Sequence, residues 1–253
     1  MTTARIELCR DGSHTLYSDT FGQFYHNPNG AVAESLHVFF ETSGILSDLQ
    51  ENKPVNVLEI GFGTGLNALL LADALLQLNS SSTVTFQSVE AFPIGIDTAK
   101  NLNYSEFLVN PWLGNHLLPV FRQLQTESAS YEFPGILQLD VFRGTVKDAQ
   151  FKSRFFNYVF HDPFSPEVNP ELWTATLFEK LKAACTPQSV LTTYCAATKA
   201  RAAMVVGGWH AARAPGALGK REMTVASLDP EKLSGFSRLN EDRLRERFAS
   251  QQR

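Results

Sequence analysis

The sequence has few cysteines, no long apolar run and no excess of positive charge, and each absence excludes a class of protein. Its three cysteines, Cys9, Cys185 and Cys195, are too few and too scattered for a disulfide framework. No Cys-x-x-Cys pair occurs and the six histidines are dispersed, so we expect no metal site. No uncharged apolar stretch approaches the ~18 residues of a membrane span, and the first ten residues lack a secretory signal. We therefore predict a cytoplasmic protein with reduced thiols.

The charge is unevenly distributed along the chain. The net charge of −4 argues against nonspecific nucleic-acid binding by the whole surface. From Lys199 to Arg253, however, 11 Lys and Arg stand against 6 Asp and Glu, a net of +5, so the remaining 198 residues carry −9. A basic C-terminal quarter fits a local anionic partner, and ordinary solvated surface charge accounts for the count equally well.

Composition and patterning predict an α/β fold. With 43% hydrophobic and 19% charged residues, the composition is that of a globular protein. Apolar runs predict strands at Val55–Ile60, Thr83–Val89, Ile136–Phe142, Phe156–Phe160 and Val190–Tyr194, and a final strand pair at Trp209–Ala214 and Met223–Leu228. Helical spacing is found at Ala31–Ile45, Leu66–Leu78, Ile94–Leu102, Trp112–Leu124, Pro170–Ala184 and Thr198–Val206.

Alternation of this kind predicts a mostly parallel sheet with helices on both faces. Residues 11–30, rich in Gly, Ser, Asn and aromatics, are predicted to be irregular. Sheets of this class bind ligands beyond the carboxyl ends of their strands. We therefore expect the chemistry of this protein just after Ile60, Val89, Phe142, Phe160 and Tyr194.

The clearest motif lies where the first of these strands turns into a helix. Glu59 is followed by Gly61, Gly63 and Gly65, which allow a tight bend and a close approach of the backbone to a ligand. A dinucleotide loop has the spacing G-x-G-x-x-G, whereas Leu66 stands at the sixth position here. A carboxylate before the loop would repel a pyrophosphate and suits a cofactor with an amino group and a positive charge. The motif thus resembles the first motif of Rossmann-like methyltransferases, which bind S-adenosylmethionine.

Three further strand ends carry candidate cofactor residues. Glu90 ends the next strand, where a carboxylate can accept hydrogen bonds from ribose hydroxyls. Thr145 follows the third strand, near the expected position of the adenine. Asp162 and Pro163 follow the fourth strand, where two prolines stiffen the exit and an acid can hold an amine beside a sulfonium. We expect no catalytic role for the neighbouring His161.

Asp162-Pro-Phe-Ser-Pro-Glu-Val-Asn-Pro-Glu-Leu-Trp173, together with the glycine loop, resembles the tRNA wobble-uridine methylaminomethyl methyltransferases. This family comprises the methyltransferase half of the bifunctional MnmC enzyme and its stand-alone relatives. The resemblance runs from about residue 11 to 228, with further matches at Asp11-Gly-Ser, Tyr25-His26, Gly30–Phe39, Thr193-Tyr194-Cys-Ala and Gly219–Met223. It departs at Gly144-Thr145, where the family usually has Gly-Asp, and this puts the adenine contact in question.

The resemblance implies methyl transfer from S-adenosylmethionine to the amine of 5-aminomethyl-uridine or its 2-thio form, in a tRNA anticodon loop. Asp162 would orient that amine and accept its proton, as the catalytic residue. Tyr25, Phe164 and Tyr194 would stack on the base or wall the pocket. Phosphates would be held by Arg201, Lys220, Arg221 and the arginines of the tail, Arg238, Arg243, Arg245 and Arg247.

The resemblance also implies one methyltransferase domain. We expect residues 1–45 to contribute to the substrate pocket, 46–230 to form the Rossmann-like core and 231–253 to form a basic tail, with no flavin oxidase domain. Three alternatives stay open: an aminopropyltransferase-like enzyme acting on a small amine, a NAD-dependent oxidoreductase, and an RNA-binding module without catalysis. The basic C-terminal quarter favours RNA over a small amine, and Glu59 with Leu66 speaks against NAD.

Overall fold

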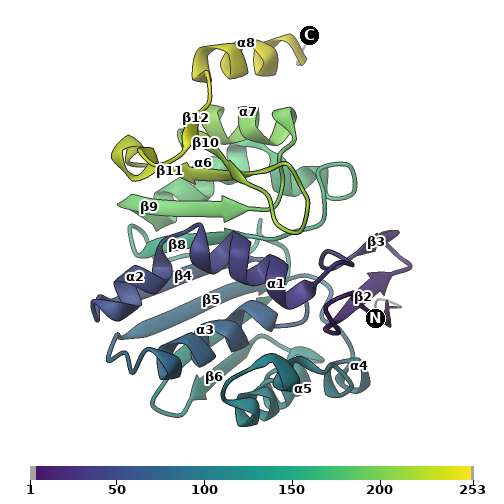
Figure 1. Cartoon of the computed structure of the whole chain (residues 1–253). Helices are drawn as coiled ribbons and strands as arrows, with labels where there is room; N and C mark the ends of the chain where they lie inside the picture. Colours follow the sequence, from purple (N-terminus) through teal and green to yellow (C-terminus); the bar gives the residue numbers. More distant parts are fainter. Residues whose placement is uncertain (1–3, 252–253) are drawn as a thin grey trace.

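A sheet of nine strands runs through the centre of the molecule in the computed structural model, which describes residues 4–251 (Figure 1). The strand order is β12-β10-β11-β9-β8-β4-β5-β7-β6. Five central strands are parallel: β4 (Val55–Ile60), β5 (Val84–Glu90), β7 (Leu137–Arg143), β8 (Phe156–His161) and β9 (Cys185–Thr193). The antiparallel strands are β6 (Ala129–Phe133), β10 (His210–Pro215), β11 (Glu222–Ser227) and β12 (Ser237–Arg238). The predicted α/β class and the predicted pairing of the last two long strands are confirmed.

Helices cover both faces of the sheet because the central strands are apolar on both sides. In β4, Val57 packs in one core cluster with Leu69, whereas the next residue, Leu58, packs in the other with Leu181. The first cluster includes α3 (Leu66–Gln77) and α5 (Leu117–Leu124), and the second includes α6 (Ala175–Ala184) and α7 (Thr198–Val206). The short helix α4 (Ile96–Lys100) precedes α5 along the chain.

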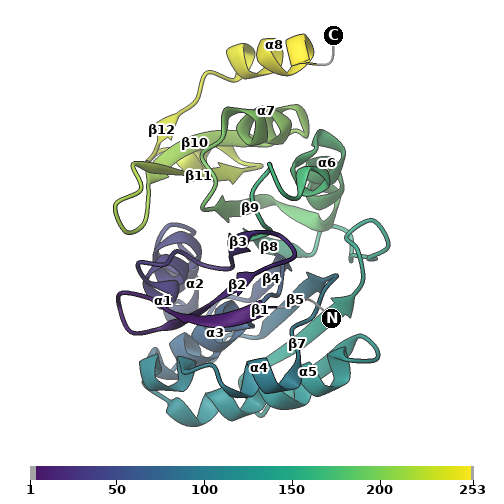
Figure 2. The same cartoon turned by 90° about the vertical axis from the view of Figure 1, so that its right-hand side faces the viewer.

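The N-terminal segment is more regular than the sequence predicts. Strands β1 (Ala4–Leu8), β2 (His14–Ser18) and β3 (Gln23–Phe24) form a small antiparallel sheet, which lies in front of β4 and β5 in Figure 2. The prediction that residues 11–30 are irregular is therefore wrong for β2 and β3. These strands are short, and they gain their stability by pairing with each other, which local composition does not reveal.

Three predicted helices are divided in the structure. The segment predicted as one helix over 31–45 forms α1 (Ala31–Ser35), a π-helical turn at Leu36–Glu41 and, after Gly44 at φ 80°, α2 (Ile45–Gln50). The segments before α5 and α6 begin as 3₁₀ turns at Pro111–His116 and Pro170–Trp173. Proline fits these positions because the first residue of a helical turn needs no N–H donor, whereas a proline further inside a helix would remove a hydrogen bond.

The C-terminal segment extends the fold beyond the expected core boundary at residue 230. Strand β12 joins the edge of the main sheet, and α8 (Glu241–Gln251) packs against α7 through Leu244, at the top of Figure 1. The ends of the expected N-terminal extension and basic tail, 1–3 and 252–253, lie outside the described residues. No helix within 4–251 has both the length and the apolar character needed to span a membrane.

Candidate active site

A cavity of about 590 Å³ opens at the carboxyl ends of the parallel strands. Residues after each of the five strands line it, at the positions where the sequence predicts the chemistry: Gly61 and Gly63 after β4, Glu90 and Phe92 at the end of β5, Thr145 after β7, Asp162 and Pro163 after β8, and Tyr194 after β9. The N-terminal segment closes the other side with Tyr17, Phe21, Tyr25 and Glu34. The volume is that of a typical small-molecule site.

The glycine loop allows the backbone of β4 to approach the loop after β8. Gly61 has φ 95°, and a Cβ there would lie 2.8 Å from the carbonyl oxygen of Asp162. Gly63, at φ 54°, lies against the ring of Tyr25. Both glycines line the cavity, whereas Gly65 does not: it precedes α3 at φ 75° and packs against Leu117. Gly65 therefore supports the turn, which corrects the expectation that it contacts the cofactor.

Glu59 lies beneath this loop and does not line the cavity. It is 1% exposed, and its carboxyl oxygens accept hydrogen bonds from Ser88 Oγ at 2.6 Å and Asn67 Nδ2 at 2.9 Å. Burial raises the pKa of Glu59 to about 8, and the nearby charge of Glu90 adds to this increase. Glu59 therefore contacts Asn67, which does line the cavity, whereas the sequence predicts direct contact of Glu59 with the cofactor.

Glu90 connects the strand end to the glycine loop. Its two carboxylate oxygens accept hydrogen bonds from the backbone N–H groups of Gly63 at 2.8 Å and Phe92 at 2.7 Å. Burial raises its pKa, and these hydrogen bonds oppose that increase. Each oxygen retains a lone pair, so the carboxylate can also accept hydrogen bonds from a ligand.

Asp162 stands at the end of β8 with its backbone N–H bonded to the carbonyl of Ile60 at 3.0 Å. Burial is the main cause that raises the pKa of its carboxyl group, and the charges of Glu59 and Glu34 raise it further. A carboxyl group with a raised pKa is a stronger base when ionised, which suits proton transfer near neutral pH.

Several aromatic rings line the cavity and contact one another. The ring of Phe164 lies 4.8 Å from Phe21 and 5.1 Å from Tyr25, centroid to centroid. Tyr194 donates its hydroxyl proton to the carbonyl oxygen of Pro163 at 2.8 Å. The structure therefore brings the three predicted substrate aromatics, Tyr25, Phe164 and Tyr194, into one cavity.

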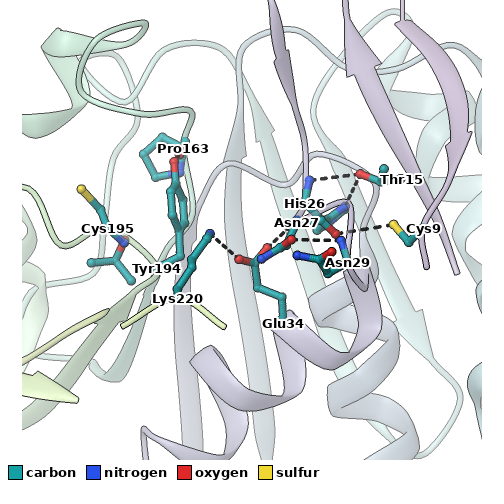
Figure 3. A network of polar contacts seen from close by, with 11 residues as sticks. Cys9, Thr15, His26, Asn27, Asn29, Glu34, Pro163, Tyr194, Cys195 and Lys220 are labelled. Atoms are coloured by element: carbon teal, nitrogen blue, oxygen red, sulfur yellow. Dashed lines mark hydrogen bonds and ion pairs between the residues drawn. The ribbon is translucent and has the colours of Figure 1, made fainter. Parts of the chain in front are cut away.

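Lys220 reaches the same cavity from the turn between β10 and β11. Its ammonium group forms an ion pair with Glu34 at 2.7 Å and lies 5.0 Å from the centre of the Tyr194 ring (Figure 3). The sequence predicts Lys220 as a phosphate contact, and in the structure its ammonium group is paired with Glu34. Sequence reasoning assigned no role to Glu34, although this residue lies within one of the segments that carry the family resemblance.

The remaining predicted substrate cations are dispersed. Arg201 is 4% exposed and donates to Thr224 Oγ1, Glu222 and the carbonyl of Met223, so it cannot hold a phosphate. Arg221 is exposed outside the cavity wall. The tail arginines 243, 245 and 247 are exposed on α8. The prediction for Arg201 is therefore wrong, because the side chain holds β11 against α7.

Thr145 lines the cavity after β7, but its hydroxyl group donates to Asp148 Oδ2 at 2.7 Å.

All three cysteines are buried and free. Within residues 4–251, no group of three or more His, Cys, Asp or Glu side chains is placed to hold a metal ion.

Residues 103–229 match a protein family described as S-adenosyl-L-methionine-dependent methyltransferase. Similar curated proteins are named tRNA 5-methylaminomethyl-2-thiouridine biosynthesis bifunctional protein MnmC. The one from Leptospira interrogans is 28% identical over 84% of this chain, and the one from Cupriavidus metallidurans is 31% identical over 88%. The chain spans about a third of the length of these relatives, 34% in each case.

Two solved structures have a similar fold. MnmC2 from Aquifex aeolicus superposes with a TM-score of 0.76 and 27% identity, over 98% of this chain and 76% of that one. Spermidine synthase from Thermotoga maritima has a TM-score of 0.56 and 12% identity, over 94% of this chain and 73% of that one. The second likeness concerns the fold alone.

Proposed function

The chain belongs to the S-adenosyl-L-methionine-dependent methyltransferases, and from this premise we propose that it methylates the amine of 5-aminomethyl-(2-thio)uridine at the wobble position of tRNA. The observation that carries this proposal is the placement of Asp162 beside the glycine loop, in one cavity with Tyr25 and Phe164. The names of the MnmC relatives support the choice of substrate.

The family disfavours the alternatives left open by the sequence. A NAD-dependent oxidoreductase and an aminopropyltransferase both use another donor than S-adenosylmethionine. The charge of the cavity does not separate the substrates, because four carboxylates line it, Glu34, Glu90, Asp162 and Glu171, and these suit any ammonium group. The choice between a small amine and a nucleoside therefore rests on the relatives and on the aromatic walls.

The cavity fits S-adenosylmethionine, which supplies a methyl group activated by a sulfonium. Gly61 and Gly63 line the cavity with backbone atoms alone, so that no side chain of theirs projects into it. Asn67 has a buried oxygen, Oδ1, without a hydrogen-bond partner in the described part of the chain, and this oxygen can accept from an amino group. Glu90 would accept from the ribose hydroxyls, and Thr145 and Pro163 would complete the wall.

Asp162 would orient the substrate amine and accept its proton. An alkylamine is mostly protonated at neutral pH, so its lone pair must be freed before it attacks a methyl group. The raised pKa of Asp162 lowers the difference in proton affinity between the carboxylate and the amine. Alignment of the nitrogen with the methyl group would supply much of the rate.

Tyr25 and Phe164 would hold the base beside Asp162. A wobble nucleotide lies in a single-stranded loop, so it can be turned into a pocket at little cost, and aromatic rings are suited to stack on it. Arg221 and the exposed arginines of α8 remain available for phosphates. With such a substrate, we propose that the protein is cytoplasmic.

The test is methylation of tRNA that carries 5-aminomethyl-2-thiouridine, with nucleoside mass spectrometry as the readout. We expect the purified protein and S-adenosylmethionine to add one methyl group to that nucleoside. The Asp162→Asn variant should lose about a hundredfold or more in kcat while its affinity for S-adenosylmethionine stays within about twofold. Unmodified nucleoside with the parent protein would exclude the substrate, and full turnover by Asp162→Asn would remove Asp162 from the chemistry.

A further inference from the structure

The ion pair of Glu34 and Lys220 is shown in Figure 3, and both residues line the cavity. Glu34 belongs to α1 and Lys220 to the turn before β11, so the pair connects segments 186 residues apart in the chain. Such an ion pair either stabilises the contact between the turn before β11 and α1, or it holds the ammonium group where a ligand can bind to it. The contacts around each partner decide between the two.

Glu34 is fixed in place by one partner on each of its carboxylate oxygens. Its side chain is 10% exposed, Oε1 accepts from Lys220 and Oε2 accepts from the backbone N–H of Asn27 at 2.7 Å. A carboxylate that is this buried requires such partners, because desolvation of a lone charge is costly. Glu34 therefore acts as the anchor of the pair.

Lys220, in contrast, keeps donors for a ligand. An ammonium group has three N–H donors, and Glu34 is the only acceptor for them among the residues that the structure describes. The side chain is 41% exposed and lines the cavity. Because Glu34 neutralises it, this ammonium group suits a neutral acceptor such as a carbonyl oxygen better than a phosphate.

Lys220 also lies on the side of the cavity where Asp162 acts. Its ammonium group lies over the ring of Tyr194, whose hydroxyl group is bonded to the carbonyl of Pro163, next to Asp162. The charge of Lys220 lowers the pKa of Asp162, against the larger effect of burial, as expected for two charged groups that line one cavity. A substrate amine held by Asp162 would therefore bring its neighbouring atoms toward Lys220.

We propose that Lys220 is a specificity-determining residue that donates a hydrogen bond to the C4 carbonyl oxygen of the target uracil. This inference rests on the proposed function. In 5-aminomethyluracil, C4 carries the carbonyl oxygen and is bonded to C5, which carries the aminomethyl group. Cytosine has an amino group, a donor, at that position. An ammonium group held by Glu34 therefore accepts uracil and rejects cytosine.

The experiment uses two anticodon stem–loop RNAs that differ only in the wobble nucleoside, 5-aminomethyluridine or 5-aminomethylcytidine. The measurement is kcat/KM for each RNA with the parent protein, Lys220→Met, Lys220→Arg and the control Lys232→Met. Lys232 is exposed and does not line the cavity. The ratio of the two values is taken within one protein preparation, so a partly unfolded variant does not change it.

We expect the parent protein and Lys232→Met to prefer the uridine RNA by the same factor. Lys220→Met should lose roughly tenfold to a hundredfold in kcat/KM for the uridine RNA and bring the ratio close to one. Lys220→Arg keeps its donors and should keep the direction of the preference. An unchanged ratio in Lys220→Met overturns the inference while the proposed function stands. Methylation of neither RNA by the parent protein overturns the proposed function, and the inference with it.

Discussion

Burial of the carboxyl group of Glu59 makes the stability of the protein depend on pH. The pKa of this group rises from 4.5 to about 8 in the folded state, mainly through loss of water. Between pH 4.5 and pH 8, the carboxyl group of Glu59 is deprotonated in the unfolded chain and protonated in the folded protein. The stabilising contribution is therefore complete below pH 4.5 and is lost as the pH rises toward 8.

The size of the effect follows from the same values. A full difference of one proton changes the free energy of unfolding by ~1.4 kcal/mol per pH unit. Between pH 6 and pH 8 the folded state begins to release the proton as well, so the expected loss is about 2 kcal/mol. Glu59→Gln keeps the shape and the acceptor oxygen but cannot titrate, so this part of the pH dependence should disappear.

The assay is urea unfolding of the parent protein and of Glu59→Gln at pH 6, 7 and 8, without cofactor. Other carboxyl groups with raised pKa values, those of Glu90 and Asp162, titrate in both proteins, so the difference between the two slopes reports Glu59 together with its electrostatic interaction with these two groups. Equal slopes would show that Glu59 is ionised in the folded protein, and the reasoning from burial would be refuted.

Three further substitutions test the site. Glu90→Gln should raise the dissociation constant of S-adenosylmethionine by roughly tenfold or more, measured by calorimetry, since it weakens charge-assisted hydrogen bonds. Gly61→Ala would place its Cβ 2.8 Å from a backbone oxygen at φ 95°, so it should cost about 2–3 kcal/mol of stability or more in urea unfolding. Gly22→Ala, at φ 62° with open space around it, is the control and should cost about 1 kcal/mol. Arg201→Met should destabilise the fold by on the order of 3 kcal/mol and leave the salt dependence of tRNA binding unchanged.

The sequence predicted the central sheet well because its strands are short apolar runs bounded by glycine and polar residues. Strand β4 has the predicted bounds, and the glycine loop, Glu90 and Asp162 follow strands at the expected edge. The periodicity of α3 is equally local, and its helix begins at the predicted residue, Leu66. These features depend on neighbours within a few residues, which the sequence shows directly.

Features formed by distant segments were not predictable in the same way. The small sheet β1–β3 and the strand β6 gain stability from pairing partners, and a single segment does not show its partner. Arg201 and Lys220 are residue types that often bind phosphates. Only the fold shows that Arg201 is buried against Thr224 and that Lys220 is paired with Glu34.

By itself, the sequence determined the α/β class, the glycine loop and the order of the acids along the chain, because backbone bending and apolar periodicity are local properties. The tertiary structure alone decided which of those acids face the cavity. It buried Glu59 under the loop, exposed Asp162 to the cavity and placed Glu34 against Lys220. The physical reason is that exposure, and with it the charge state of a carboxyl group, depends on segments that meet only when the chain has folded.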